Sequence, residues 1–216
     1  MNAFRTLIIA TLGCAALPAF ALSDNGQAHL QQLQTRWAEI NYQTPEKQRE
    51  EAFAKLVTQA DAALASEPKA PELLIWRGII LSTQAGAKGG LGALGLVKQA
   101  KASLEQALAI DPQALAGSAY TSLGSLYYQV PGWPIGFGDD KQAEKMLGQA
   151  LAINPDGLDP NYFYGDFLQR QKRYEEARAA LEKALAAKDR PGRELADKGR
   201  REEARALLQQ VESKLQ

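Results

Sequence analysis

The sequence has very few of the residues that most often carry chemistry. It contains one cysteine, Cys14, and one histidine, His29, in 216 residues, so a metal site built on thiolate or imidazole ligands is excluded. No G-x-S-x-G nucleophile motif occurs. The stretch GLGALG at 90–95 has the letters of a dinucleotide-binding loop, but no strand is predicted before it. We therefore predict a protein that is not an enzyme, with no catalytic residues, no metal and no cofactor.

An excess of one charge and the patterns of β-structure are missing as well. The 25 basic and 25 acidic residues cancel, so the chain lacks the positive charge with which proteins neutralise nucleic-acid phosphates. No segment alternates apolar and polar residues with β-branched side chains, which is the pattern of a strand. We therefore expect an all-α protein that does not bind nucleic acid.

The one long apolar run of the chain lies near its N-terminus. A basic residue precedes an apolar stretch at 7–20, and Ala-Phe-Ala at 19–21 has the A-x-A form of a signal-peptidase site. The stretch is shorter than the ~20 residues of a membrane-spanning helix. The sequence thus predicts a signal peptide at 1–22 that is cleaved near Ala21, and a single mature domain at 23–216 without stable membrane insertion. The expected location is periplasmic or secreted.

A second interpretation of this segment is lipidation at Cys14. The residues Leu12-Gly13-Cys14 resemble a bacterial lipobox, although Thr11 stands where such boxes usually have leucine. A cleaved signal peptide would remove the only cysteine, and the mature chain could then form no disulfide. Its fold would be held by packing alone.

Against these absences, one pattern occurs three times in the predicted mature chain. An alanine is followed four residues later by leucine and three residues after that by a second alanine. This spacing places the three residues on one face of a helix, and a repeated helical unit must stack on its neighbours to bury that face. The copies are Ala100, Leu104 and Ala107 with Pro112 after them, Ala143, Leu147 and Ala150 with Pro155 after them, and Ala177, Leu181 and Ala184.

Each copy follows a glycine, and glycine and copy together resemble the tetratricopeptide repeat (TPR). Gly78, Gly124 and Gly165 stand where that family has the small residue of its first helix. Small residues let the two helices of a hairpin approach closely. The resemblance implies an all-α, TPR-like solenoid of helical hairpins with about three to four repeats. The polar helix expected at 194–214 suits a C-terminal capping helix.

The distance from the glycine to the first alanine is not constant. It is 12 residues in the third copy, but 19 in the second and 22 in the first. Two hairpins are therefore expected to carry insertions, at 85–95 and 129–139, which project from one edge of the solenoid. Helices are expected at 27–41, 46–66, 71–85, 97–110, 114–129, 139–153, 159–171, 174–187 and 194–214.

The resemblance also implies a binding surface, because the first helix of each hairpin lines the concave groove of such solenoids. The set of Lys and Asn with which chaperone adaptors of the family hold a peptide carboxylate is not present, so that activity is not carried over. The inward positions of the binding groove are Ile75, Ile79, Thr121, Ser125, Tyr128, Tyr162, Asp166 and Gln169, with Glu72, Thr83, Ser118 and Arg170 beside them.

Two further segments have two interpretations each. In the insert loop at 131–140, Trp133 and Phe137 stand among prolines and glycines, and Trp133 either forms an aromatic lip over a ligand site or folds back to cap the hairpin. The segment at 188–201 is rich in arginine and forms either a site for an anion or partner, or a turn at Pro191-Gly192 followed by a salt-bridged helix. Its arginines are Arg190, Arg193, Arg200 and Arg201.

A narrower resemblance concerns the same insert loop. Pro131-Gly132 and Gly138-Asp139 are similar to a loop in the periplasmic helical T component of tripartite (TRAP) transporters. Membership of that group would imply an accessory component of a transport system that binds a small ligand. The broader resemblance implies a non-catalytic periplasmic scaffold that binds a protein or peptide partner in its groove. We take the scaffold as the leading hypothesis and the small-ligand protein as the alternative.

Overall fold

A computed structural model describes residues 22–216 of the chain. The predicted signal peptide, its cleavage site and Cys14 lie outside the described residues. Within 22–216 the secondary structure is helical, and the only β-type pairing there is an isolated bridge between Gly132 and Gly138. The predicted all-α fold is confirmed.

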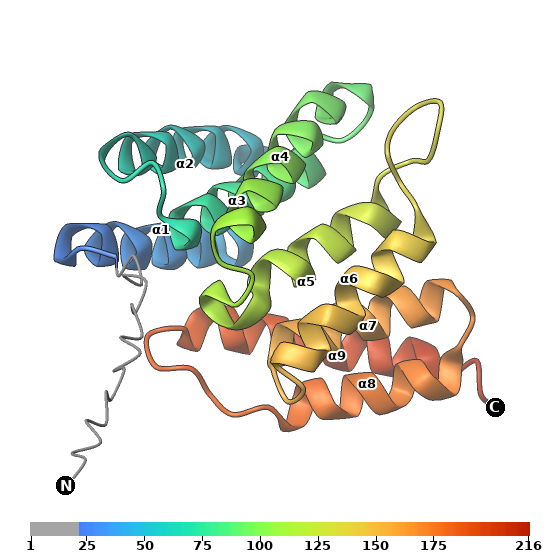
Figure 1. The fold of residues 1–216 in the computed structure, drawn as a ribbon. Helices are drawn as coiled ribbons and strands as arrows, with labels where there is room; N and C mark the ends of the chain where they lie inside the picture. Colours follow the sequence, from blue (N-terminus) through green and yellow to red (C-terminus); the bar gives the residue numbers. More distant parts are fainter. Residues whose placement is uncertain (1–21) are drawn as a thin grey trace, which may run out of the picture.

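The helices form four antiparallel hairpins that stack along the chain, followed by one last helix (Figure 1). Within the described residues, helices are at or near each predicted position, with the largest differences at the start of α1 and at the two ends of the first insertion. The elements are α1 (Asp24–Gln43), α2 (Glu46–Ser66), α3 (Pro71–Lys88), the short 3-10 helix η1 (Leu91–Ala93), α4 (Leu94–Ile110), α5 (Ala114–Gln129), α6 (Asp140–Ile153), α7 (Leu158–Arg170), α8 (Tyr174–Ala186) and α9 (Glu194–Glu212).

Helix α1 begins three residues earlier than expected because Ser23 caps it. The Ser23 hydroxyl accepts a hydrogen bond of 3.0 Å from the backbone N–H of Gly26, which satisfies one of the free donors of the first turn. The first insertion is shorter than expected, since α3 extends to Lys88 and α4 begins at Leu94. Glycines with positive φ at 89 and 90 make the turn between them.

The repeated motif makes the same contact in three hairpins. A Cβ atom added at Gly78 would lie 2.6 Å from Cγ of Leu104, and one added at Gly124 would lie 2.6 Å from Cγ of Leu147. At Gly165 the same distance to Cγ of Leu181 is 2.7 Å. Each leucine of a second helix therefore fills the space left by the glycine of its first helix, which explains why the two residues recur in a fixed register.

The last helix returns to the start of the chain. Besides packing on α8 and α7, α9 contacts α1. Ala196 of α9 belongs to the same buried cluster as Trp37 of α1 and Trp76 of α3. Gly199 of α9 lies directly against the ring of Tyr42 at the end of α1. The C-terminal helix therefore does more than cap the last repeat, because it joins the two ends of the solenoid.

Substitution of a hairpin glycine tests this packing. Gly124→Ala should lower the free energy of unfolding by about 1–3 kcal/mol, because the added methyl group overlaps Leu147. The measurement is urea denaturation followed by circular dichroism. Gly148→Ala in the same hairpin is the matched control, because nothing lies within 4 Å of its added Cβ, and it should be neutral or stabilising by up to ~1 kcal/mol. Equal effects of the two substitutions would contradict the proposed close approach.

Candidate ligand-binding pocket

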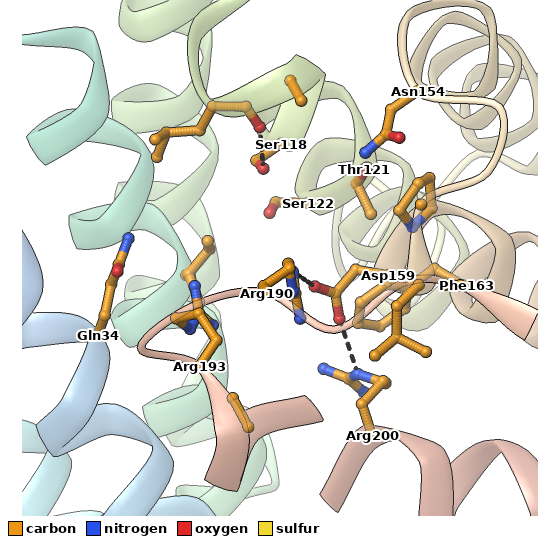
Figure 2. A pocket seen from close by; sticks show the side chains of 18 of the residues that line it. Gln34, Ser118, Thr121, Ser122, Asn154, Asp159, Phe163, Arg190, Arg193 and Arg200 are labelled. Atoms are coloured by element: carbon orange, nitrogen blue, oxygen red, sulfur yellow. Dashed lines mark hydrogen bonds and ion pairs between the residues drawn. The ribbon is translucent and has the colours of Figure 1, made fainter. Parts of the chain in front are cut away.

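The contact of α9 with α1 turns the concave groove into a pocket. The cavity has a volume of about 930 Å³ and is lined by residues of α1, α3, α5, α7, the end of α8 and the segment that leads into α9. Figure 2 shows side chains from these elements pointing toward one another across the space. A volume of this size suits a small molecule or a short piece of a larger one.

The wall formed by α3 and α5 is neutral and presents hydroxyl oxygens. Each of four hydroxyls donates its proton to a backbone carbonyl of its own helix, so its free lone pairs can only accept hydrogen bonds. The pairs are Ser82 with Gly78 at 2.8 Å, Thr83 with Ile79 at 2.8 Å, Ser118 with Leu115 at 2.6 Å, and Ser125 with Ser122 at 2.9 Å. Trp37 uses one such acceptor, donating from Nε1 to Oγ1 of Thr83 at 2.9 Å.

The opposite wall carries an ionic network centred on Asp159. Nη1 of Arg190 lies 2.7 Å from Oδ2 of Asp159, and Nε of Arg200 lies 3.0 Å from Oδ1. Arg190 also binds Asp197, with its Nη2 2.5 Å and its backbone nitrogen 2.9 Å from the carboxylate oxygens. The network therefore ties the α8–α9 segment to the first turns of α7 and α9. Figure 2 shows Asp159 between Arg190 and Arg200.

This network holds Asp159 ionised. Burial opposes the charged form of the carboxyl group, but the charges of Arg200 and Arg190 outweigh it and lower the pKa of Asp159 to about 2. Arg200 stacks on two aromatic rings at the same time, with its guanidinium carbon 4.5 Å from the ring centre of Tyr162 and 4.7 Å from that of Phe163. These contacts fix the orientation of the guanidinium group.

Arg193 differs from the other arginines of the wall. Among the described residues it makes no ion pair, and its Nε is buried without a hydrogen-bond partner. Its guanidinium lies over the ring of Trp76, 4.8 Å from the ring centre, and Trp76 in turn meets Trp37 edge-on at 5.9 Å. The hydroxyl of Tyr42 is likewise buried without a partner. The pocket thus contains two buried donors that the described residues leave unsatisfied.

The backbone adopts a left-handed conformation where α5 begins. Leu115, Ala116 and Gly117 have φ values of 48°, 52° and 76°, a left-handed turn that costs non-glycine residues roughly 1–2 kcal/mol each. Leu115 and Ala116 line the pocket, and Gly117 packs against Ile153 of α6. Strain of this kind persists only where the surrounding packing enforces it, and here it shapes one wall of the cavity.

Three of the eight predicted groove residues line the pocket: Ile79, Thr121 and Ser125. Thr83 and Ser118, predicted beside them, line it too. The other five do not. Ile75 is fully buried in the core between hairpins, so its placement in the groove is wrong. The rest are Tyr128, Tyr162, Asp166 and Gln169.

Two of these four residues are covered by neighbouring parts of the chain. Tyr128 is buried, and its hydroxyl donates to Oδ2 of Asp166 at 2.8 Å. Burial, followed by the charge of Asp166, raises the pKa of Tyr128. Tyr162 lies under Arg200 of α9. The register of the repeat was right, but α9 occupies part of the surface that an open solenoid would expose.

The capping interpretation of Trp133 is wrong, because its side chain is 90% exposed. An aromatic lip over this pocket is not formed by Trp133 either, since the pocket lining does not include it. Phe137 takes the capping role instead, since it packs edge-on against Tyr127 with ring centres 5.7 Å apart. Both ends of the α5–α6 loop leave the helices at the same end of the molecule as the α3–α4 tip (Figure 1).

For the arginine-rich segment, features of both interpretations are present. Pro191 and Gly192 form the turn, and the salt bridges of the helix are made. Yet Arg190, Arg193 and Arg200 also line the pocket. Arg201 lies outside the pocket lining and donates to the backbone carbonyl of Ala187 at 2.8 Å.

Several pocket residues carry no signal in the sequence. Residues of α1, the α6–α7 connection and the start of α7 line the pocket because α9 joins the two ends of the solenoid, and the repeat pattern does not encode that contact. These residues are Gln34, Trp37, Tyr42, Asn154, Asp159 and Phe163. A partial signal was available for Asp159, because an aspartate in the first turn of a helix faces whatever approaches that helix end.

The described part of the chain offers no cluster of His, Cys, Asp and Glu side chains that could hold a metal ion. The pocket can bind a ligand through hydrogen bonds, through contacts with aromatic faces and through the unpaired guanidinium of Arg193. Among residues 22–216, no helix is both long and apolar enough to cross a membrane.

Comparisons with known proteins agree with the repeat. Profiles of the tetratricopeptide repeat match residues 91–114 and 135–196. The chain is similar to the crystal structure of a thermophilic TPR protein from Thermus thermophilus, at 25% identity and a TM-score of 0.57, covering 88% of this chain and 91% of that one. It is also similar to the crystal structure of MamA, at 22% identity and a TM-score of 0.45, covering 78% of this chain and 91% of that one. No curated protein sequence matches.

The ionic network makes a prediction about acid stability. The pKa of Asp159 is about 2 in the folded protein and 3.8 without its partners. Its stabilisation of about 2 kcal/mol is therefore present above pH ~4 and is lost as the pH falls toward 2. Asp159→Asn should lower the free energy of unfolding by at least this amount at pH 7, and the difference from the wild type should shrink between pH 4 and pH 2.

The measurement is urea unfolding across this pH range. Asp156→Asn is the matched control, because Asp156 lines the same pocket but is exposed and makes no ion pair among the described residues. It should change the free energy of unfolding by less than ~0.5 kcal/mol. An Asp159→Asn protein with wild-type stability at pH 7 would show that the network does not stabilise the fold.

Proposed function

This chain is a tetratricopeptide-repeat protein, and from that premise we propose that it is a non-catalytic, periplasmic accessory component of a transport system that holds a small ligand in its closed groove. Repeats of this family suggest a protein-interaction scaffold. The ligand pocket is the specialisation that this chain adds to the scaffold.

The observation that carries the proposal is the closure of the groove by α9. An extended peptide needs a groove that is open along its length, so that flanking residues can leave at both ends. Here α9 packs on both α1 and α7, and Tyr128 and Tyr162 are covered. The remaining cavity of about 930 Å³ has the size of small-molecule sites. This favours the small-ligand alternative over a peptide in the groove.

The periplasmic location rests on the signal-peptide pattern at 1–22. Cleavage after Ala21 would leave Leu22 and the N-cap Ser23 on the mature chain, so α1 would keep its cap. Expression of the full chain in a Gram-negative host, followed by fractionation and N-terminal sequencing, should give a periplasmic protein that begins at Leu22 or Ser23. A cytoplasmic protein with its first 21 residues intact would contradict this location.

A pocket-filling substitution tests the ligand function. Ser122→Phe places a ring from α5 into the cavity and should abolish ligand binding while the helix content stays unchanged. Ligands are sought in a library of small metabolites and unstructured peptides by thermal shift, because a ligand that binds the folded state stabilises it and raises the melting temperature once its concentration exceeds its Kd. Quenching of Trp37 and Trp76, measured in a Trp133→Phe background, gives a second readout.

Thr58→Phe is the matched control, since Thr58 is exposed on α2, outside the pocket lining. A small molecule that stabilises the wild type and the Thr58→Phe protein but not the Ser122→Phe protein is the expected result. If only extended peptides bind, or if Ser122→Phe binds as well as the wild type, the closed groove is not a small-ligand site and the scaffold hypothesis takes its place.

A further inference from the structure

The arginines of the pocket lining differ in their ion pairs. The carboxylates of Asp159, Asp197 and Glu203 are bound by Arg190 and Arg200. Arg193 stands beside this network with no carboxylate of its own among the described residues. Burial, followed by the positive charge of Arg190, lowers the pKa of Arg193. A negative group placed against Arg193 would favour its charged form and so offset both burial and the charge of Arg190.

The position of Arg193 suits recognition of a planar anion. Its guanidinium lies on the face of Trp76, 4.8 Å from the ring centre, which restrains the plane of its N–H donors. A guanidinium held in this way can donate two parallel hydrogen bonds to a carboxylate. Tyr42, whose buried hydroxyl also lacks a partner, is close enough to influence the charge state of Arg193. Two donors in the same pocket thus lack an acceptor.

The opposite wall offers hydrogen-bond acceptors instead of donors. Ser82, Thr83, Ser118 and Ser125 have given their protons to backbone carbonyls, so the lone pairs left on these oxygens accept hydrogen bonds. Figure 2 shows Ser118 and Ser122 on the wall that faces Arg190 and Arg193. A molecule that spans the pocket would meet donors at one end and acceptors at the other.

Arg190 and Arg200 are less available to a ligand than Arg193, because both are already paired with Asp159, which remains ionised between them. Lys183 and Lys188 also line the pocket and form no ion pair among the described residues. Arg193 is the arginine of the lining that is free to take a carboxylate.

We propose that the pocket binds a small carboxylate that carries hydroxyl or ammonium groups, with its carboxylate on Arg193 and its donors on the serine and threonine oxygens of α3 and α5. This inference rests on the proposed small-ligand function. It adds the chemical class of the ligand and assigns Arg193 as the residue that selects it.

The first experiment uses the wild-type mature protein and pairs of probes that differ in one charge. Gluconate is compared with the neutral glucitol, and mandelate with mandelamide. A wider set of hydroxy and amino carboxylates, each beside its amide, follows in the same assay. Binding is measured by isothermal titration calorimetry and thermal shift at millimolar concentrations. Acids should bind at least ~30-fold more tightly than their neutral partners.

The second experiment assigns the preference to Arg193. In the Arg193→Gln protein the acid should bind no more tightly than its amide, while the affinity for the amide stays unchanged. Arg193→Lys keeps the charge but loses the paired hydrogen bonds, and should restore part of the preference. Arg205→Gln is the matched control, because Arg205 is an exposed arginine of α9, the helix that follows Arg193, makes no ion pair among the described residues and lies outside this pocket. A purely structural role of Arg193 would weaken acid and amide equally.

The outcomes separate this inference from the function on which it rests. If neutral ligands bind as tightly as acids and Ser122→Phe abolishes both, the pocket function stands and the carboxylate assignment is overturned. If no member of the acid set binds the wild type, the assignment also fails. If nothing in the small-molecule library binds, the proposed function itself fails. The wild-type comparison of acid with amide decides the question even if Arg193→Gln does not fold.

Discussion

Gly199 of α9 lies against the ring of Tyr42 at the end of α1, and this contact joins the two ends of the solenoid. Hairpins alone would form an open, curved array, in which each unit touches only its neighbours. The contact between first and last helices adds a long-range link that the repeats do not provide. The ionic network of Arg190, Asp159 and Asp197 then holds the α8–α9 segment against α7. The pocket exists because both links are made.

The closure changes what each helix face does. Positions on α3 and α5 that would line an open groove become one wall of a cavity, and their hydroxyls turn into a set of hydrogen-bond acceptors. Positions on α7 are divided between the pocket and the contact with α9, since Phe163 lines the cavity while Tyr162 lies under Arg200. The result is an asymmetric site, with acceptors on one side and an unpaired cation on the other.

The exposed surface retains the features of a scaffold. Trp133, Ile135 and Leu91 are exposed at the tips of the two insertions, well apart from the pocket residues. These apolar side chains and the pocket are separate surfaces, which a simple peptide-binding groove would merge. The fold permits this combination because insertions at hairpin tips leave the stacking of the helices unchanged.

The sequence by itself determined the helical hairpins and their register. The glycines at 78, 124 and 165 and the leucines at 104, 147 and 181 are local partners, separated by about one hairpin, and steric fit between them can be recognised from spacing alone. The same register identified Ile79, Thr121 and Ser125 as inward residues. It placed Ile75, Tyr128 and Tyr162 in the groove wrongly, because the repeat specifies which face of a helix points inward and not what covers it.

Only the tertiary structure decided that the groove is closed, that Arg193 stays unpaired and that Trp133 points to solvent. These features depend on the curvature accumulated over four hairpins, which brings α9 to α1 across more than 150 residues of chain. Small rotations between neighbouring repeats add up to that approach, and no single motif in the sequence encodes their sum.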